Sequence, residues 1–423
     1  MIRGGDRPCT QDYDRDFRGI FLSPVINPSH RGMVSMRTET PQGKNSGLVF
    51  RTITRAPLIA AHHLIMTCPQ LKKLYFKHYA SYKFHHYMLK NRLHMLYPVN
   101  VQWLATFNCN FSCIHCEASA GTTKVRELTT EEVIKLVDEL AAMRVKHLLI
   151  SGGEPLLRHD IFDIIRHIRE TGMQYGIATN GYLVSRYHDD FRKYPPELYF
   201  TSIDGLSEAN DRIRGMPGAF RNCMAALEFF RSIDVPLRIV NTVALPATIE
   251  TLPEMKNVLQ QSAATLWSIA LPIPVGRAKE NDAMSLNNNQ IRILLSFIAA
   301  ARREMNVEIT EDAGYLGCLA DRVRPMPFFC GAGLKSCAIM PDGEVLGCQI
   351  AYDSSFSEGN IRTTPFREIW EEGFSRFRNP SFDASCRECP YVRPCRNGCW
   401  GMRLGNKHCL REIWDDPEYC KKV

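Results

Sequence analysis

The stretch Cys109-Asn-Phe-Ser-Cys113-Ile-His-Cys116 holds three cysteines with the spacing C-x3-C-x2-C. It directly follows an apolar run, residues 101–107, whose composition is typical of a buried strand. Three thiolates this close can bind three corners of a cubic iron–sulfur cluster and leave the fourth iron open, whereas an electron carrier uses four cysteines. The stretch therefore predicts a reactive metal site at the end of a strand. Half of a zinc site, for which Cys113 and Cys116 have suitable spacing, is the alternative.

Length and composition fit a globular protein. The chain has 423 residues, enough for two or three domains with a large core. No run reaches the ~18 apolar residues that cross a bilayer, and the N-terminus lacks the apolar stretch of a signal peptide, so we expect a cytoplasmic protein. Sixteen clustered cysteines favour metal clusters over a disulfide framework. The net charge of +7 is too modest to indicate a nucleic-acid partner.

The part before the cysteine stretch is of two kinds. Residues 1–48 are rich in Gly, Pro, Ser and charge, which predicts a disordered arm. Residues 49–99 carry basic, His and aromatic side chains at helical spacing but no Asp or Glu. We interpret them as a basic helical extension that caps the main domain. A docking surface for an acidic partner peptide, or peripheral contact with an anionic membrane, is the alternative.

Residues 100–306 alternate between strand-like and helix-like segments. The expected strands are residues 101–107, 147–151, 175–179, 198–203, 237–243 and 266–273. The expected helices are residues 130–143, 161–171, 219–233, 249–261 and 288–305. Such alternation predicts a parallel sheet covered by helices, with the chemistry at the carboxyl ends of the strands.

Polar segments follow several of these strands. Gly152-Gly153-Glu154-Pro155 follows the second, Thr179-Asn180-Gly181 the third and Ser202-Ile203-Asp204-Gly205 the fourth. Together with the three-cysteine stretch they resemble the radical SAM superfamily. The resemblance implies an α/β fold with a partial (β/α)6 TIM-like barrel over residues 100–306. It also implies S-adenosylmethionine (SAM) as a cofactor, bound at the open iron of a 4Fe–4S cluster.

The resemblance assigns the ligands of this site residue by residue. Cys109, Cys113 and Cys116 would hold the cluster. The methionine end of SAM would lie against Gly152 and Gly153, whose missing side chains permit a close approach, and against Glu154, which can accept hydrogen bonds from the ammonium group. The remaining residues expected to bind the cofactor are Asn180, Ser202, Asp204 and Arg214.

Two of these assignments have further detail. Ser202 and Asp204 are expected near the ribose, at the end of the fourth strand. Arg214 is expected to pair with the cofactor carboxylate, and Arg212 is the alternative, which we disfavour because of its offset from Ser202. Residues 274–278, Pro-Val-Gly-Arg-Ala, resemble a family segment near the adenine.

The C-terminal part, residues 307–423, is rich in cysteine and resembles the SPASM extension of radical SAM enzymes. That resemblance implies two auxiliary 4Fe–4S clusters. The first would be held by Cys330, Cys337, Cys348 and Cys399, and the second by Cys386, Cys389, Cys395 and Cys420. Cys409 is the alternative to Cys420, which we prefer because the Asp-Pro sequence before it matches relatives. A zinc-ribbon-like structural domain is the competing interpretation of these spacings.

The resemblance implies that SAM is cleaved reductively to a 5′-deoxyadenosyl radical, which abstracts hydrogen from a substrate. The expected substrate is a ribosomally made peptide and the expected electron donor a flavodoxin- or ferredoxin-like protein. Gln349 stands where sulfatase maturases have a basic Asp, which disfavours that reaction because an amide cannot take up a proton. The rivals are modification of a tetrapyrrole side chain and a non-catalytic iron–sulfur electron carrier.

Overall fold

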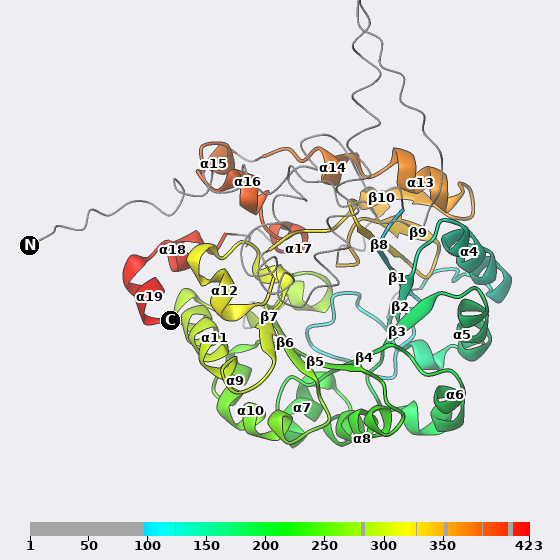
Figure 1. Cartoon of the computed structure of the whole chain (residues 1–423), viewed down its shortest axis with the longest axis horizontal. Coiled ribbons are helices and arrows are strands. Elements are labelled where there is room, and N and C mark those ends of the chain that lie inside the picture. The colour runs from blue at the N-terminus through cyan, green and yellow to red at the C-terminus, as the bar shows by residue number, and fades with distance from the viewer. Residues whose placement is uncertain are drawn as a thin grey trace, which may run out of the picture. The chain divides into compact units, whose positions relative to one another are not determined.

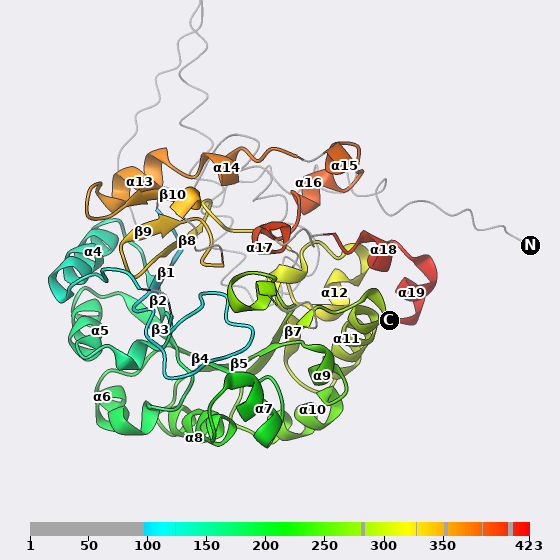
Figure 2. The same cartoon turned by 180° about the vertical axis from the view of Figure 1, so that it is seen from behind.

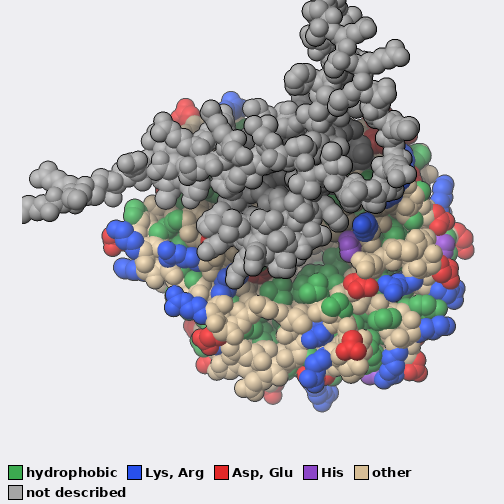
Figure 3. Space-filling model, in the orientation of Figure 1, with side chains coloured by type: hydrophobic (Ala, Val, Ile, Leu, Met, Phe, Trp, Pro, Cys, Tyr) green, Lys and Arg blue, Asp and Glu red, His purple; other side chains and the backbone are tan. Residues whose placement is uncertain are grey.

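The computed structural model describes residues 97–122, 124–280, 284–326, 328–350, 354–382, 384–404 and 409–423. The predicted arm, residues 1–48, lies outside these residues, as does the predicted helical extension up to residue 96. None of the helices in the described part of the chain combines the length and the apolar character needed to span a membrane. On the face drawn in Figure 3, basic and acidic side chains lie side by side over the described surface.

The core of the fold is a curved parallel sheet with helices along its outside (Figure 1). Each strand pairs in parallel with the next one along the chain. The strands are β1 (Asn100–Leu104), β2 (His147–Ser151), β3 (Gln174–Ala178), β4 (Leu198–Ser202), β5 (Leu237–Val243), β6 (Leu266–Ala270) and β7 (Val307–Ile309). The predicted barrel of strands and outer helices is confirmed, with β7 as an additional strand that the sequence pattern did not predict.

The outer helices bury one apolar face each. In α5 (Ile161–Glu170) the four isoleucines at positions 161, 164, 165 and 168 are buried, which is the spacing of a single helix face. The others are α4 (Thr130–Ala142), α6 (His188–Lys193), α7 (Ser207–Arg214), α8 (Ala219–Ser232), α9 (Pro246–Ile249), α10 (Leu252–Gln260) and α11 (Asn288–Ala301). The expected helix over 249–261 is α10, which begins at Leu252 with a proline in its first turn, and residue 249 ends the separate short helix α9.

The sheet continues into the C-terminal part of the chain. Strand β8 (Ser336–Ile339) pairs in parallel with β1, and β9 (Glu344–Leu346) and β10 (Ser357–Asn360) follow it antiparallel. The result is one sheet of ten strands, in the order β10-β9-β8-β1-β2-β3-β4-β5-β6-β7. The expected boundary between residues 306 and 307 thus falls between α11 and β7, inside this sheet.

Short helices make up most of the remaining C-terminal part. They are α12 (Ala320–Val323), α13 (Phe366–Glu372), α14 (Ser375–Arg378), α15 (Ala384–Arg387), α16 (Val392–Cys395), α17 (Trp400–Leu404), α18 (Arg411–Trp414) and α19 (Pro417–Lys422).

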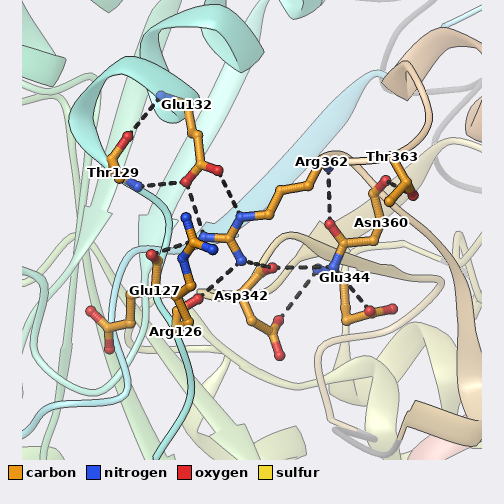
Figure 4. A network of polar contacts seen from close by, with 9 residues as sticks. All are labelled: Arg126, Glu127, Thr129, Glu132, Asp342, Glu344, Asn360, Arg362 and Thr363. Atoms are coloured by element: carbon orange, nitrogen blue, oxygen red, sulfur yellow. Dashed lines mark hydrogen bonds and ion pairs between the residues drawn. The ribbon is translucent and has the colours of Figure 1, made fainter.

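A polar network ties the C-terminal part to α4 (Figure 4). Arg362 donates to both carboxylate oxygens of Glu132, at 2.7 and 3.0 Å, and to the backbone oxygens of Glu127 and Asp342, each at 2.9 Å. The hydrogen bonds from Arg362 hold the pKa of Glu132 at about 2. A guanidinium that satisfies acceptors in both parts fixes the strand extension against the barrel.

Candidate functional site

The loop between β1 and α4, residues 105–129, carries the three-cysteine stretch and is called the cysteine loop below. Figure 2 draws it in cyan inside the curve of the sheet. Backbone hydrogen bonds attach the loop at two places. Gly153 N, just beyond the end of β2, donates to Thr106 O of the loop at 2.7 Å. Ser112 N of the loop donates to Arg214 O, at the end of α7, at 3.3 Å. The cysteines therefore lie at the carboxyl ends of the strands, as the alternation of segments predicts.

Gly152 and Gly153 lie against the cysteine loop. A Cβ at position 152 would lie 2.6 Å from the Thr106 carbonyl oxygen, and one at position 153 would lie 2.2 Å from that of Asn108. Gly152 also has φ +139°. The glycines are required because two backbone segments pass each other here, a packing reason that the sequence-based expectation of close ligand approach did not include.

The three thiols of the cysteine loop lie close enough to influence one another. Burial raises the pKa of Cys109 to about 11, and the charges of Glu154, Cys113 and Cys116 act in the same direction. Backbone N–H groups face two of the sulfurs: Phe111 N lies 3.4 Å from Cys109 Sγ, and Ala120 N lies 3.4 Å from Cys116 Sγ. Partly buried thiols with N–H donors suit an iron–sulfur cluster, whose negative charge these groups would stabilise.

No three His, Cys, Asp or Glu side chains of the described residues are gathered as ligands of one metal ion would be. A cubane differs from such a site because each thiolate binds its own iron.

Glu154 is completely buried beside the loop. Its Oε1 accepts from Leu156 N at 3.0 Å and Thr179 Oγ1 at 2.7 Å, and its Oε2 accepts from Asn180 N at 2.8 Å. Burial raises the pKa of Glu154 to about 7. Because a carboxylate has about four acceptor positions, Oε2 retains one for a further donor.

Asn180 links the end of β3 to the cysteine loop. Its Nδ2 donates to Asn110 Oδ1 at 2.8 Å. Ser202 is half-buried at the end of β4. Both residues lie at the strand ends where the sequence predicts cofactor contacts.

Asp204 is paired with two basic side chains of the site. It is fully buried, its Oδ1 accepts from Val243 N at 2.8 Å, and its Oδ2 lies 2.7 Å from His115 Nε2 and 2.6 Å from Arg214 Nη2. Although burial opposes ionisation, the charges of Arg214 and His115 hold the pKa of Asp204 below its usual range. Asp204 therefore acts as an internal counter-ion in this structure, and its contact with the ribose stays a prediction.

Arg214 has one donor left over. Nη2 binds Asp204, Nη1 points to Cys113 Sγ at 3.8 Å, and Nε is buried without a hydrogen-bond partner among the described residues. Arg212, the alternative, is 73% exposed and lies 4.0 Å from Glu208 on the surface of α7. A buried guanidinium N–H beside a cluster cysteine fits a carboxylate ligand, so the geometry favours Arg214 over Arg212.

Arg277 clamps the cysteine loop from the end of β6. Its Nε donates to Cys113 O at 2.7 Å, its Nη1 to Ala120 O at 2.8 Å, and its backbone N to Cys116 O at 3.0 Å. Next to it, a Cβ at Gly276 would lie 2.2 Å from Glu117 O. The sequence singled out this segment for the adenine but gave no sign of the clamp, because the partners are 157 and 164 residues apart.

Most cysteines of the first expected auxiliary set lie near one another. The set is Cys330, Cys337, Cys348 and Cys399. Burial raises the pKa of Cys348 to about 12 and that of Cys399 well above its usual range, and both thiols are influenced by Cys330. Cys337 is buried on β8 opposite Val101, and the charged group that acts on it is Arg378. Three of the four thiols, from separate loops, therefore lie close enough to interact.

Three of the four cysteines expected in the second set line one cavity. They are Cys386, Cys389 and Cys395, the cavity has a volume of about 520 Å³, and the fourth cysteine in its lining is Cys409, the alternative to Cys420. Cys420 is paired with Cys318 in a disulfide. That Cys420 binds the cluster stays a prediction, and the Asp-Pro sequence on which it rests does not determine where the side chain points.

Comparisons with known proteins find relatives that match most of the chain. The model of the radical SAM superfamily matches residues 103–259, and that of an iron–sulfur cluster-binding domain, SPASM, matches residues 330–390. An AdoMet-dependent heme synthase of Methanosarcina barkeri is 31% identical over 344 residues, which cover 76% of this chain and 96% of that protein. The mycofactocin maturase MftC of Mycolicibacterium smegmatis is 29% identical over 322 residues, covering 73% of this chain and 79% of that protein.

A solved structure shares the fold. The crystal structure of Streptococcus suis SuiB bound to precursor peptide SuiA matches with a TM-score of 0.62 at 16% identity, covering 80% of this chain and 79% of that chain. The chain therefore belongs to the radical SAM superfamily, and it is an enzyme with a SPASM domain whose cofactors are SAM and 4Fe–4S clusters.

Proposed function

We propose that Cys109, Cys113 and Cys116 hold the cluster at which SAM binds, and that the protein uses it to oxidise or crosslink a peptide substrate. When bound, the reduced cluster and SAM supply a 5′-deoxyadenosyl radical that removes a hydrogen atom from an unactivated C–H bond. The two SPASM cysteine sets would hold auxiliary clusters. A flavodoxin- or ferredoxin-like protein would supply the electron.

The observation that carries the proposal is the unpaired Nε of Arg214 beside Cys113. A buried N–H without a partner costs free energy, so its retention next to the cluster ligands is explained by an acceptor that arrives with the cofactor. The carboxylate of SAM is such an acceptor. On the other side of the cysteines, Glu154 Oε2 has acceptor capacity for the ammonium group.

The protein's own groups orient the cofactor and exclude water. Asp204 fixes the direction of Arg214, and Thr179 and Asn180 fix that of Glu154. Arg277 holds the cysteine loop across the strand ends. Because these anchors are buried or partly buried, the cofactor would meet groups that are already in position, which lowers the cost of ordering them on binding.

The test of cofactor binding is spectroscopic. Addition of SAM to the reduced, anaerobically reconstituted protein should change the electron paramagnetic resonance spectrum of one cluster, because a ligand reaches an open iron. An unchanged spectrum, with no binding in equilibrium dialysis, would favour the non-catalytic electron carrier.

The peptide substrate is supported by two relatives: MftC is named a maturase, and SuiB is seen with a precursor peptide. A short peptide encoded beside the gene is the substrate to test. Addition of this peptide should increase the formation of 5′-deoxyadenosine, and the mass of the peptide should change in the same reaction.

A second candidate is the modification of a tetrapyrrole side chain. The specific observation in its favour is the heme synthase similarity, which extends over almost the whole length of that relative. An iron–coproporphyrin offered in parallel with the peptide separates the two candidates, since only the true substrate should be altered with consumption of SAM. If the porphyrin alone reacts, the peptide assignment is wrong while the radical chemistry stands.

A further inference from the structure

We propose that the second auxiliary cluster of this chain is held by Cys386, Cys389, Cys395 and Cys409, and that Cys318 and Cys420 form a separate thiol pair. The proposal rests on the iron–sulfur chemistry proposed above, but it assigns a different ligand set from the one that the family spacing implies.

The cavity is the first line of support. It has a volume of about 520 Å³, and all four proposed ligands contribute to its lining. Its other walls combine apolar side chains such as Tyr391, Leu410 and Trp414 with charged ones, Arg411, Glu412, Asp415 and Asp416. Four thiols that come from different segments to one cavity are what a cluster with complete cysteine ligation requires. Cys420 is not in the lining.

The proximity of Cys409 to the other thiols is seen at Cys395. Among the thiols around Cys395, Cys409 has the largest charge interaction with it, ahead of Cys386 and Cys389. Arg411 gives independent evidence, since its Nη1 lies 4.0 Å from Cys389 Sγ. Because Arg411 is only two residues beyond Cys409, this contact holds the Cys409 segment against the cavity.

The chain between Cys395 and Cys399 explains why the two auxiliary sets separate here. Arg396, Asn397 and Gly398 all have positive φ, at 49°, 68° and 70°. Three successive residues in this region reverse the backbone sharply. The reversal leaves Cys395 in the cavity wall and turns Cys399 toward Cys330 and Cys348 of the first set.

Cys420 is held away from the cavity by the packing of α19. Tyr419, the residue before it, donates to Arg292 O at 2.6 Å and contacts Ser296 at 3.2 Å, so this end of the chain is fixed on α11. Arg322 donates to the Cys420 carbonyl oxygen at 2.7 Å. These contacts direct the Cys420 sulfur toward Cys318, and both sulfurs lie near the Trp414 carbonyl oxygen, at 3.0 and 3.3 Å.

The first experiment counts iron. Wild type and the variants Cys409→Ala, Cys420→Ala and Cys318→Ala would be reconstituted anaerobically, and iron and sulfide would be measured per chain. Alanine is used because a serine oxygen can replace a thiolate at iron. We expect roughly twelve irons in the wild type, about a third fewer in Cys409→Ala, and no loss in the two other variants. The spectral response to SAM of the cluster at Cys109, Cys113 and Cys116 checks that each variant is folded.

The outcomes distinguish this inference from the proposed function. A wild type that holds no iron–sulfur cluster overturns both. A wild type with three clusters in which Cys420→Ala loses the iron, or in which Cys409→Ala loses none, overturns only the ligand assignment.

A second experiment needs no variant. The reconstituted wild type would be treated with a mild thiol reductant and then with iodoacetamide under anaerobic conditions, and the modified cysteines would be identified by mass spectrometry. We expect rapid modification of Cys318 and Cys420 and protection of Cys409 until the clusters are removed with a chelator. Protection of Cys420 together with rapid modification of Cys409 would contradict the assignment.

Discussion

Arg214 Nη2 lies 2.6 Å from Asp204 Oδ2, and both side chains are buried at the carboxyl ends of the strands. The same carboxylate oxygen lies 2.7 Å from His115, which stands between two cysteines of the cysteine loop. One carboxylate therefore connects the end of β4, the end of α7 and the cysteine loop. The proposed cofactor site is organised around this pair.

Replacement of Arg214 tests the role of its unpaired Nε. We expect Arg214→Lys to weaken SAM binding by about 10–100-fold, because a charge-assisted hydrogen bond contributes about 1.5–3 kcal/mol and an ammonium cannot satisfy Asp204 and the cofactor together. Equilibrium dialysis against the reconstituted protein with its clusters oxidised, so that SAM is not cleaved, measures the change. Arg212→Lys is the matched control, since that side chain is exposed, and weakening in Arg212→Lys but not in Arg214→Lys would reverse the choice of arginine.

Removal of the Asp204 carboxylate should destabilise the folded protein. Asp204→Ala leaves Arg214 and His115 without their shared counter-ion, and the loss of one partner of a buried charge pair costs about 3–5 kcal/mol. The midpoint of anaerobic thermal unfolding should fall clearly. Asp189→Ala, which removes a 99% exposed partner of Arg192, should change it very little. Similar midpoints for the two variants would show that Asp204 is not an internal counter-ion.

The Arg277 clamp should decide how long the cluster is retained. Arg277→Gln removes side-chain hydrogen bonds to Cys113 O and Ala120 O, and we expect the cysteine loop to open more often. The measurement is the rate at which cluster absorbance disappears in the presence of an iron chelator, which should rise several-fold. Lys279→Gln, on the same segment but exposed, serves as control and should leave the rate unchanged.

Asp312 should make stability depend on pH. Burial raises its pKa to about 7, although Leu271 N donates to it and Arg324 carries an opposite charge nearby. The folded state then holds the proton of Asp312 more tightly than the unfolded state does. Protonated Asp312 therefore stabilises the folded state at low pH, and this stabilisation is lost as pH rises from about 4 through about 7. Asp312→Asn keeps an acceptor for Leu271 N but has no proton to lose. Its thermal unfolding temperature should fall less between pH 5 and pH 7 than that of the wild type. The same dependence of unfolding temperature on pH in both proteins would exclude this role of Asp312.

Most of the barrel could be predicted from periodicity. The strands at 147–151 and 237–243 and the helix start at Thr129 follow from apolar runs and a capping box, which are local signals. Strand β7 has only three residues, and the buried side chain of α7 is a single asparagine, so neither offers a pattern to detect. Both elements are formed because neighbouring elements of the fold hold them.

The site divides in the same way. The three cysteines, Glu154 and Arg214 belong to short motifs that can be read from the sequence. The pairing of His115 with Asp204 joins residues 89 apart, and the clamp of Arg277 joins residues 164 apart, so no local pattern contains them. The preference for Cys420 over Cys409 in the second set depended on the Asp-Pro sequence before Cys420, whereas the direction of its side chain depends on how α19 packs against α11.

The most direct test of the central claim is the formation of 5′-deoxyadenosine from SAM by the reduced, anaerobically reconstituted protein. The wild type should form it, and Cys113→Ala should form none, because only two thiolates then remain to hold the cluster with the open iron. Product from Cys113→Ala at the wild-type rate, or a wild-type cluster in which a fourth protein side chain already occupies that iron, would contradict the account.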